Sequence, residues 1–115
     1  MVLVALDAAR DLEKEGIECE VIDPRTLRPL DTKALVNSVM KTNRAVVVEE
    51  GWPFCGVGAQ VVDFIQRERF DHLDAPVIRV TGADVPMPYN RVLERASKPT
   101  PDRVIAAVQQ VTYSA

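Results

Sequence analysis

The sequence predicts an α/β fold, a three-layer sandwich built around a mainly parallel sheet. Helical and extended patterns alternate along the chain with short links between them, which favours parallel strands joined by right-handed crossovers. The run at 45–48 is continuously apolar, as expected of a strand covered on both faces. With 115 residues, 47% hydrophobic and 27% charged, the chain has the size and balance of one globular domain, residues 1–115.

The first two expected elements are a helix and a short strand. Leu3, Leu6, Ala9 and Leu12 recur at helical spacing, and Gly16 is typical of a helix stop, so we expect a helix over 2–16. Residues 17–23 then alternate between apolar and polar side chains and end at a proline, which predicts a strand.

A second helix and a second strand follow. Asp31 or Thr32 is a suitable N-cap for a helix that ends near 42–43, with apolar residues at helical spacing inside it. The continuous apolar run predicts a strand over 45–49, followed by a loop over 50–56.

The second half of the chain repeats this alternation. We expect a helix over about 57–70, an acidic turn at 71–74 and a third strand over 76–81. A loop stiffened by Pro86 and Pro88 leads to a short helix near 90–96. Thr100 followed by Pro101 is an N-cap with a first-turn proline, which predicts a last helix to about 111.

Charge and hydropathy argue against several classes of protein. Lys and Arg number 14 against 17 Asp and Glu, so the net charge of −3 offers no basic excess for nucleic acid. The longest apolar run is six residues, 1–6, against the roughly 20 needed to span a bilayer. No basic region precedes that run and only two cysteines are present, so we expect an intracellular chain with reduced thiols and no membrane partner.

The glycines at 56 and 58 raise the possibility of an anion site. They stand between a buried strand and a helix, where backbone amides and the helix dipole favour a negative group. The phosphate-loop and dinucleotide patterns both fail, because Val57, Gly58 and Val61 occupy positions that those motifs reserve for other residues. A free-standing anion- or phosphate-binding module therefore remains an alternative to a purely structural role for Gly56 and Gly58.

No complete catalytic or metal-binding constellation is present in the sequence. Cys55 stands just before a helix start, where a thiolate is stabilised, but no base stands near it in the sequence. His72 is the single histidine. Paired histidines, a CxxC motif and regularly spaced carboxylates are all missing, so we predict no catalytic, cofactor-binding or metal-binding residue.

The loop after the strand at 45–49 is the candidate interface. Neighbouring residues of a strand point to opposite faces, so Glu49 and Glu50 should not share a proton. Trp52 and Phe54 are large aromatics in a loop, a residue type enriched at contact surfaces. Such a loop can also fold back onto its own core, and the sequence leaves both arrangements open.

Four segments together resemble a known family. They are EKEGIECEVID, RTLRPLDT, SVMKTNRAVVVEEGWP and LDAPVIRVTGADVPMPY, and they are spread over residues 13–89. The sequence resembles the carboxyl-terminal, transketolase-like domain of the beta subunits of pyruvate dehydrogenase. The resemblance implies membership of an oxidoreductase complex that decarboxylates pyruvate and acetylates a lipoyl group.

The same resemblance implies a non-catalytic role for this domain. In the family, thiamine diphosphate and magnesium are held by the alpha subunit and by the beta subunit's preceding domain, so this chain alone is expected to bind neither and to be inactive. Its implied partners are the alpha subunit, the second beta subunit of a heterotetramer, and the subunit-binding domain of the acyltransferase. By the family's motif, Asp74 and the terminal carboxylate of Ala115 would contact that docking domain. The resemblance implies a bacterial cytoplasm or a mitochondrial matrix as the compartment.

The resemblance also implies a first strand that this sequence lacks. Family domains begin with a strand that leads into the first helix, whereas this chain begins on the helix. Either the chain is a fragment of a longer subunit, which we favour, or the strand's place is empty or filled by another chain. An unpaired position in a sheet would be a liability.

Overall fold

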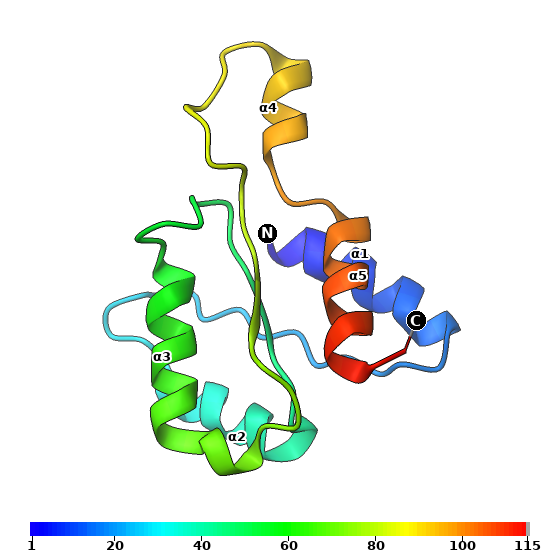
Figure 1. Cartoon of the computed structure of the whole chain (residues 1–115), viewed down its shortest axis with the longest axis vertical. Coiled ribbons are helices and arrows are strands. Elements are labelled where there is room, and N and C mark those ends of the chain that lie inside the picture. Colours follow the sequence, from blue (N-terminus) through cyan, green and yellow to red (C-terminus); the bar gives the residue numbers. More distant parts are fainter. Residues whose placement is uncertain (115) are drawn as a thin grey trace.

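The computed structural model describes residues 1–114, and its fold is the predicted α/β class (Figure 1). The elements in chain order are α1 (Val2–Lys14), α2 (Thr32–Thr42), β1 (Val46–Val48), α3 (Val57–Arg69), the 3-10 turn η1 (Phe70–His72), β2 (Ile78–Val80), α4 (Arg91–Ser97) and α5 (Pro101–Thr112). β1 and β2 pair in parallel, with Val46 opposite Ile78 and Val48 opposite Val80. The predicted parallel sheet is confirmed.

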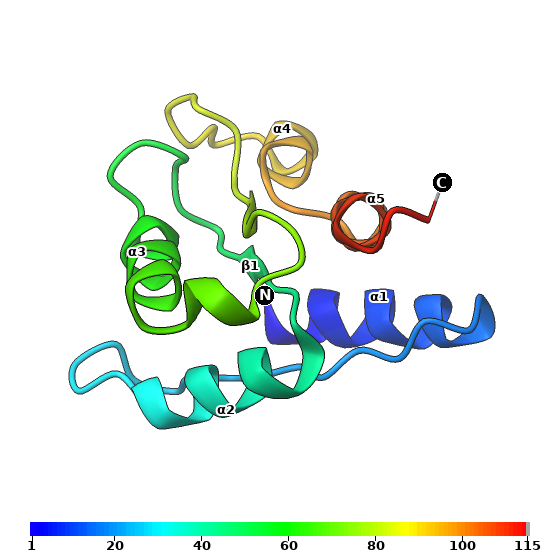
Figure 2. The ribbon, with the colours of Figure 1, turned by 60° about the horizontal axis from the view of Figure 1, so that its bottom comes forward.

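Helices cover both faces of this sheet, which gives the three expected layers (Figure 2). Val46 and Val48 pack toward α1 and α5, in a cluster with the buried Ala8 and Val104. Val47, whose side chain points the other way, joins the cluster between α2 and α3. The continuous apolar run is therefore explained, because successive valines fill two different cores.

Local signals set most helix ends as predicted. The Asp31 carboxylate accepts a hydrogen bond from the amide of Ala34 and caps α2. Asn43 ends that helix in the left-handed conformation, at φ 61°. Thr100 caps α5 through the amide of Arg103.

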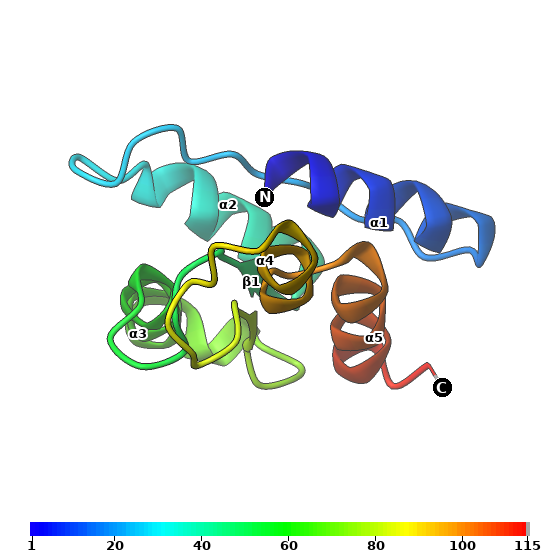
Figure 3. The same ribbon diagram turned by 90° about the horizontal axis from the view of Figure 1, so that it is seen from above.

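The buried stripe of α1 differs from the predicted one. Ala8 and Leu12 are fully buried, whereas Leu3 is 76% exposed. The helix packs mainly against α5 (Figure 3), so a single neighbour, rather than a full sheet face, selects the side that is covered. The prediction of a helix was right, and the prediction that Leu3 lies on its core side was wrong.

Residues 17–23 do not form the predicted strand. The segment has no ladder partner, and in Figure 1 it runs across the direction of β1 instead of beside it. A strand is defined by its neighbour, and among residues 1–114 the only paired strands are β1 and β2. The period-two pattern was read correctly, but the pairing that it requires is not formed.

The loops that follow β1 and β2 lie together at one end of the molecule. Both strands run in the same direction, so their carboxyl ends meet at the same edge, and α4 lies at this end as well (Figure 1). The loop over 50–56 and the loop over 81–90 therefore become neighbours although about 30 residues of sequence separate them.

Candidate functional site

A largely buried ion pair organises the carboxyl edge of the sheet. Arg79 of β2 donates to the Glu49 carboxylate from Nε, at 3.1 Å, and from Nη2. Only 14% of the Glu49 side chain and 20% of the Arg79 side chain are exposed. Arg79 Nη1 also donates to the carbonyl of Pro53 at 2.8 Å. The pair thus fixes both the strand end and the loop that follows it.

The anion that the start of α3 attracts is supplied by the chain itself. The amide of Gly58, in the first turn of α3, donates to Oε2 of Glu49 at 2.9 Å, where the helix dipole favours a negative group. Both glycines of this turn leave room for the pair, because a Cβ on Gly56 or Gly58 would collide with the side chains of Glu49 and Arg79. We therefore do not retain a free anion site at this helix start.

Glu50 points away from Glu49, as the alternation of a strand predicts. It pairs with Lys98 at 2.9 Å, and Lys98 also contacts Glu94 at 2.6 Å. The Glu94 carboxylate, then that of Glu50, raise the pKa of Lys98, while Lys98 lowers the pKa of Glu94. This partly exposed triad connects the loop after β1 to α4.

Two loops present a group of exposed apolar side chains, which we call the aromatic loop surface. Its members are Trp52 at 54% exposed, Phe54 at 79%, Val85 at 46%, Met87 at 54% and Tyr89, which is fully exposed. The indole Nε1 of Trp52 donates to the carbonyl of Val85 at 2.9 Å, so the two loops are joined. Of the two arrangements the sequence left open, the exposed one is observed.

A hollow of about 480 Å³ lies beside this surface. Trp52, Phe54 and Val57 line one part of it, and Pro24 and Leu27 line another. Leu27 is itself 60% exposed, which extends the apolar area beyond the two loops. Large exposed apolar areas on a folded chain mark sites of contact with other molecules.

Asp74 lies on a different part of the molecule, close to the end of α5. Its side chain is 57% exposed and has Arg44 Nη1 at 3.5 Å, so one cation already partly balances its charge. The hydroxyl of Tyr113 donates to the backbone carbonyl of Asp74 at 3.3 Å. The chain's last turn therefore runs beside Asp74, while Ala115, the other predicted docking residue, lies outside the described residues.

The thiol and the histidine do not form a pair. Cys55 is exposed in the loop before α3, and His72 follows that helix. A helix of 13 residues separates them, which is roughly 20 Å at a rise of about 1.5 Å per residue. Nor does any group of three or more His, Cys, Asp or Glu converge within residues 1–114 in a way that could hold a metal ion.

Several residues at the carboxyl edge of the sheet were not predicted from the sequence. They include Arg79, the partner of Glu49, and Lys98, the partner of Glu50. One signal was available, because a lone arginine inside an apolar strand requires a buried counter-charge. The apolar residues of the second loop carried no comparable signal, since exposure is set by tertiary structure.

Among the described helices, none is both long and apolar enough to cross a membrane.

Comparison with known proteins places this architecture in a family. Residues 1–104 match the model of the transketolase C-terminal domain. The pyruvate dehydrogenase E1 component subunit beta of Rickettsia felis is 52% identical over 112 residues, 97% of this chain and 34% of the relative. The mitochondrial subunit of the same name from Mus musculus is 56% identical over 106 residues, 91% of this chain and 30% of the relative.

This chain thus spans about one third of the length of these curated relatives. The match nevertheless runs through both halves of the fold, including the two strands and the loops that carry the Glu49 and Arg79 pair. By a family model that covers most of its residues and by its α/β architecture, the chain belongs to the transketolase C-terminal domain family.

Proposed function

We propose that this chain is the assembly and docking domain of a pyruvate dehydrogenase E1 beta subunit and takes no chemical step itself. The relatives that match it are named as beta subunits of that enzyme's E1 component, in bacteria and in mitochondria. The proposed setting is accordingly a bacterial cytoplasm or a mitochondrial matrix.

The aromatic loop surface is the observation that carries the assembly role. Two loops that follow different strands expose Trp52, Phe54 and Tyr89, and a hydrogen bond from Trp52 to the carbonyl of Val85 joins the loops. Aromatics at the centre of a contact supply much of its binding energy. The buried Glu49 and Arg79 pair holds the first loop in place before any partner arrives, so little ordering entropy is lost on binding. The proposed partners on this surface are the alpha subunit and the second beta subunit.

The docking role rests on the other end of the molecule. Asp74 is exposed, and the last turn of α5 lies beside it through Tyr113. A negative group at this position suits a basic partner, for which we propose the subunit-binding domain of the acyltransferase. Because Arg44 already stands 3.5 Å from Asp74, that partner would have to compete with or add to an existing ion pair.

We propose that this chain alone holds neither thiamine diphosphate nor magnesium. Magnesium prefers several oxygen ligands around one point, and residues 1–114 bring no such set together. Glu49, the best-oriented buried carboxylate, is already engaged by Arg79 and Gly58. The proposal therefore derives no step through thiamine diphosphate or magnesium on this chain.

The test of the assembly role is binding of the immobilised chain to a cognate alpha subunit. Phe54→Ser should weaken that binding by at least about tenfold, since a buried aromatic anchor contributes 2 kcal/mol or more to an interface. The matched control is Phe70→Ser, because Phe70 is 70% exposed but lies beyond the opposite end of α3. Equal loss for both variants, or no binding by the unaltered chain, would contradict the assembly role.

A second experiment separates the docking role from the assembly role. Asp74→Asn should weaken binding to the acyltransferase's subunit-binding domain and flatten its salt dependence, because charge pairs of this kind are screened by salt. Asp71→Asn serves as the control, since Asp71 is an exposed carboxylate three residues away. Binding that ignores both salt and the Asp74 charge would exclude the proposed contact.

A further inference from the structure

Residues 83–97 form a loop that closes on itself beyond the carboxyl edge of the sheet (Figure 1). We call this segment the α4 loop. The amide of Ala83 donates to the carbonyl of Ser97 at 2.8 Å, so the two ends of the loop meet. The amide of Gly82, directly before it, donates to the carbonyl of Gly51 at 2.9 Å, and a Cβ on Gly82 would collide with the backbone there. The base of the α4 loop is therefore fixed to the loop after β1.

The helix that this loop carries is exposed on most of its sides. Of the seven residues of α4, only Glu94 and Ser97 are not exposed, and these two lie three positions apart on one stripe. Val92 and Leu93 are 74% and 58% exposed. Isolated helices shorter than about 12–15 residues are marginal in water, and helices in proteins are stabilised mainly by burial of an apolar face. α4 has the apolar side chains for such burial but little of the burial itself.

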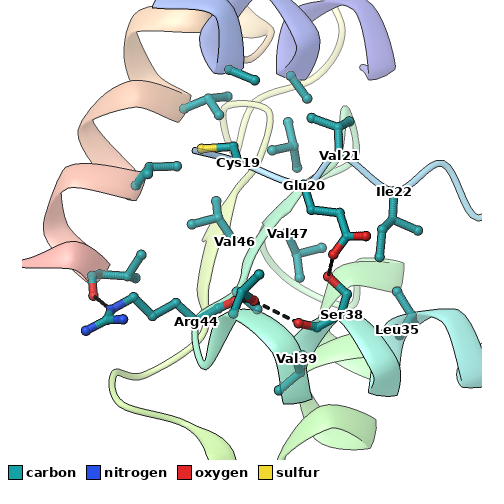
Figure 4. Close-up of a pocket in the computed structure, with 18 of the residues that line it drawn as sticks. Cys19, Glu20, Val21, Ile22, Leu35, Ser38, Val39, Arg44, Val46 and Val47 are labelled. Carbon is teal, nitrogen blue, oxygen red and sulfur yellow. Dashed lines mark hydrogen bonds between the residues drawn. The ribbon is translucent and has the colours of Figure 1, made fainter. Parts of the chain in front are cut away.

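The apolar hollows of this chain do not cover α4. The hollow of about 470 Å³ beside β1, drawn in Figure 4, is walled mainly by β1, α1, α2 and the segment 17–24. The hollow of about 480 Å³ is lined by the loop after β1, the start of α3, Pro24 and Leu27. No residue of the α4 loop, all of which the structure describes, lines either hollow. The apolar side chains of α4 are thus left to another molecule.

The unpaired charges of α4 are both positive. Arg91 and Arg95 are exposed and stand four positions apart, and neither has an ion-pair partner among residues 1–114. Glu94, the one carboxylate of this helix, is already bound to Lys98 at 2.6 Å. Arginine is enriched at protein contacts, and its guanidinium matches the geometry of a carboxylate. Charge complementarity therefore calls for an acidic surface opposite α4.

A groove fits the helix better than a plane does. Val92 and Leu93 are successive residues, so their side chains leave the helix about 100° apart. A flat surface, such as a lipid bilayer, buries one of these directions, whereas the walls of a groove bury both. A second copy of this chain does not suit α4 in a two-fold contact, because such a contact would set Arg91 and Arg95 of the copies against each other.

We propose that the α4 loop inserts into an apolar groove on a different polypeptide chain, and that Arg91 and Arg95 bind carboxylates at the rim of that groove. The groove buries Val92 and Leu93 and so supplies the cover that α4 lacks. This inference deepens the proposed assembly role and rests on it, and the partner to which it assigns the groove is the alpha subunit.

The experiment measures binding of the immobilised chain to the cognate alpha subunit at low and at high salt. Arg91→Glu should weaken binding by at least about tenfold at low salt and by less at high salt, because facing like charges repel and salt screens them. The matched control is Arg103→Glu, since both arginines are exposed in the first turn of a helix. A glutamate is favourable in the first turn, so melting of α4 would not explain a selective loss.

Amide exchange measures the burial of α4 directly. The amide of Glu94 donates to the carbonyl of Asn90, and its exchange should slow by at least about tenfold when the alpha subunit is bound, because a short exposed helix frays until it is covered. The amide of Asn43 ends α2, at the opposite end of the molecule from α4 (Figure 1), and should not change. Unchanged exchange at Glu94 in the bound chain would overturn the proposal.

The binding results separate this inference from the assembly role. Equal binding by Arg91→Glu and Arg103→Glu, with Phe54→Ser still weak, would overturn the inference and leave the assembly role standing. No binding by the unaltered chain would contradict the assembly role and the inference together.

Two other partners are distinguished with the same variants. If the chain binds phosphatidylglycerol vesicles, and Arg91→Glu abolishes that binding but not binding to the alpha subunit, α4 contacts a lipid surface and the proposal fails. If the mass of the unaltered chain doubles in ultracentrifugation, and that of Arg91→Glu does not, α4 contacts a second copy. That result would also overturn the proposal.

Discussion

The two sides of β1 differ sharply in how their polar groups are satisfied. At its carboxyl end, Glu49 receives hydrogen bonds from Arg79 and Gly58, and the pair reaches the loop at Pro53. Along the edge away from β2, Val46 and Val48 line an apolar hollow of about 470 Å³, and among residues 1–114 their backbone groups have no recorded partner there. The polar groups at the carboxyl end of β1 are therefore paired, whereas the backbone groups along its outer edge are not.

The difference shows that two parts of one strand restrain their surroundings unequally. A largely buried ion pair that also hydrogen-bonds the backbone of the next loop stabilises one arrangement of that loop, and here the loop displays aromatic side chains. An apolar edge with unpaired backbone groups adds no comparable restraint. The paired carboxyl end of β1 is therefore the part suited to holding a preformed partner surface.

The largest expected effect on stability is at the paired carboxyl end of β1. Glu49→Ala removes the carboxylate but leaves Arg79 largely buried, which should lower the free energy of unfolding by about 3 kcal/mol. Glu50→Ala, one residue further along, removes a half-exposed carboxylate and should cost less than about 1 kcal/mol. Urea denaturation of both variants measures the difference. Similar losses for the two would mean that burial of the pair contributes little.

A smaller loss is expected from the glycine that makes room for the pair. In Gly58→Ala the new Cβ would collide with the Glu49 carboxylate, and overpacking of this kind costs about 1–3 kcal/mol. Gly51→Ala is the control, because its Cβ would meet only Glu49 Oε2 at 3.7 Å. Thermal unfolding should place Gly58→Ala well below the control. A Gly58→Ala chain as stable as Gly51→Ala would show that the first turn of α3 can shift freely.

Valine truncation compares the closed and open sides of the sheet directly. Val80 is 4% exposed, and Val80→Ala should cost about 2 kcal/mol, near the transfer value for a buried valine. Val46→Ala should cost about half as much, because Val46 is only half-buried beside the apolar hollow. Denaturant midpoints test the order of the two losses. The reverse order would indicate that Val46 is fully buried in solution.

The smallest expected effect concerns pH at the Lys98 triad. Because Lys98 lowers the pKa of Glu94, the ionised Glu94 carboxylate stabilises the fold at pH values above its unfolded pKa. This stabilisation is lost as the pH falls through the lower pKa that Glu94 has in the folded protein. Because Glu94 and Glu50 raise the pKa of Lys98, the charged Lys98 amine stabilises the fold at pH values below its unfolded pKa. This stabilisation is lost as the pH rises through the higher pKa that Lys98 has in the folded protein.

Glu94→Gln is the variant that tests this pH dependence. It should flatten the acid limb of stability against pH by lowering the stability at neutral pH, and only slightly, because the triad is partly exposed and screened by solvent. Melting temperatures from strongly acidic pH, below the ordinary pKa of a glutamate, up to neutral pH measure the effect, with Glu68→Gln as a surface control. A steeper acid limb in Glu94→Gln would reverse the assigned sign.

Much of the fold was predictable because its signals are local. Asp31, Asn43 and Thr100 set helix ends through contacts within a few residues, and the sequence alone indicated all three. The continuous valine run predicted a strand covered on both faces, which the two core clusters confirm. The alternation of Glu49 and Glu50 also followed from strand geometry, and each points to a different partner.

The candidate site was only half predictable, for a physical reason. The sequence marked Trp52 and Phe54 as contact residues, but it could not tell exposure from burial, because that depends on what packs beside the loop. It also could not pair Glu49 with Arg79, since 30 residues separate them and only the parallel register of β1 and β2 brings them together.

The sequence by itself determined the α/β class, the order of the helices and of the two paired strands, and the membership of the chain in a family. Tertiary structure alone decided that residues 17–23 stay unpaired and that the anion at the start of α3 is Glu49. Propensity and capping act within a turn or two of chain. Pairing, burial and charge compensation depend on neighbours that are distant in sequence, so they are settled only when the chain has folded.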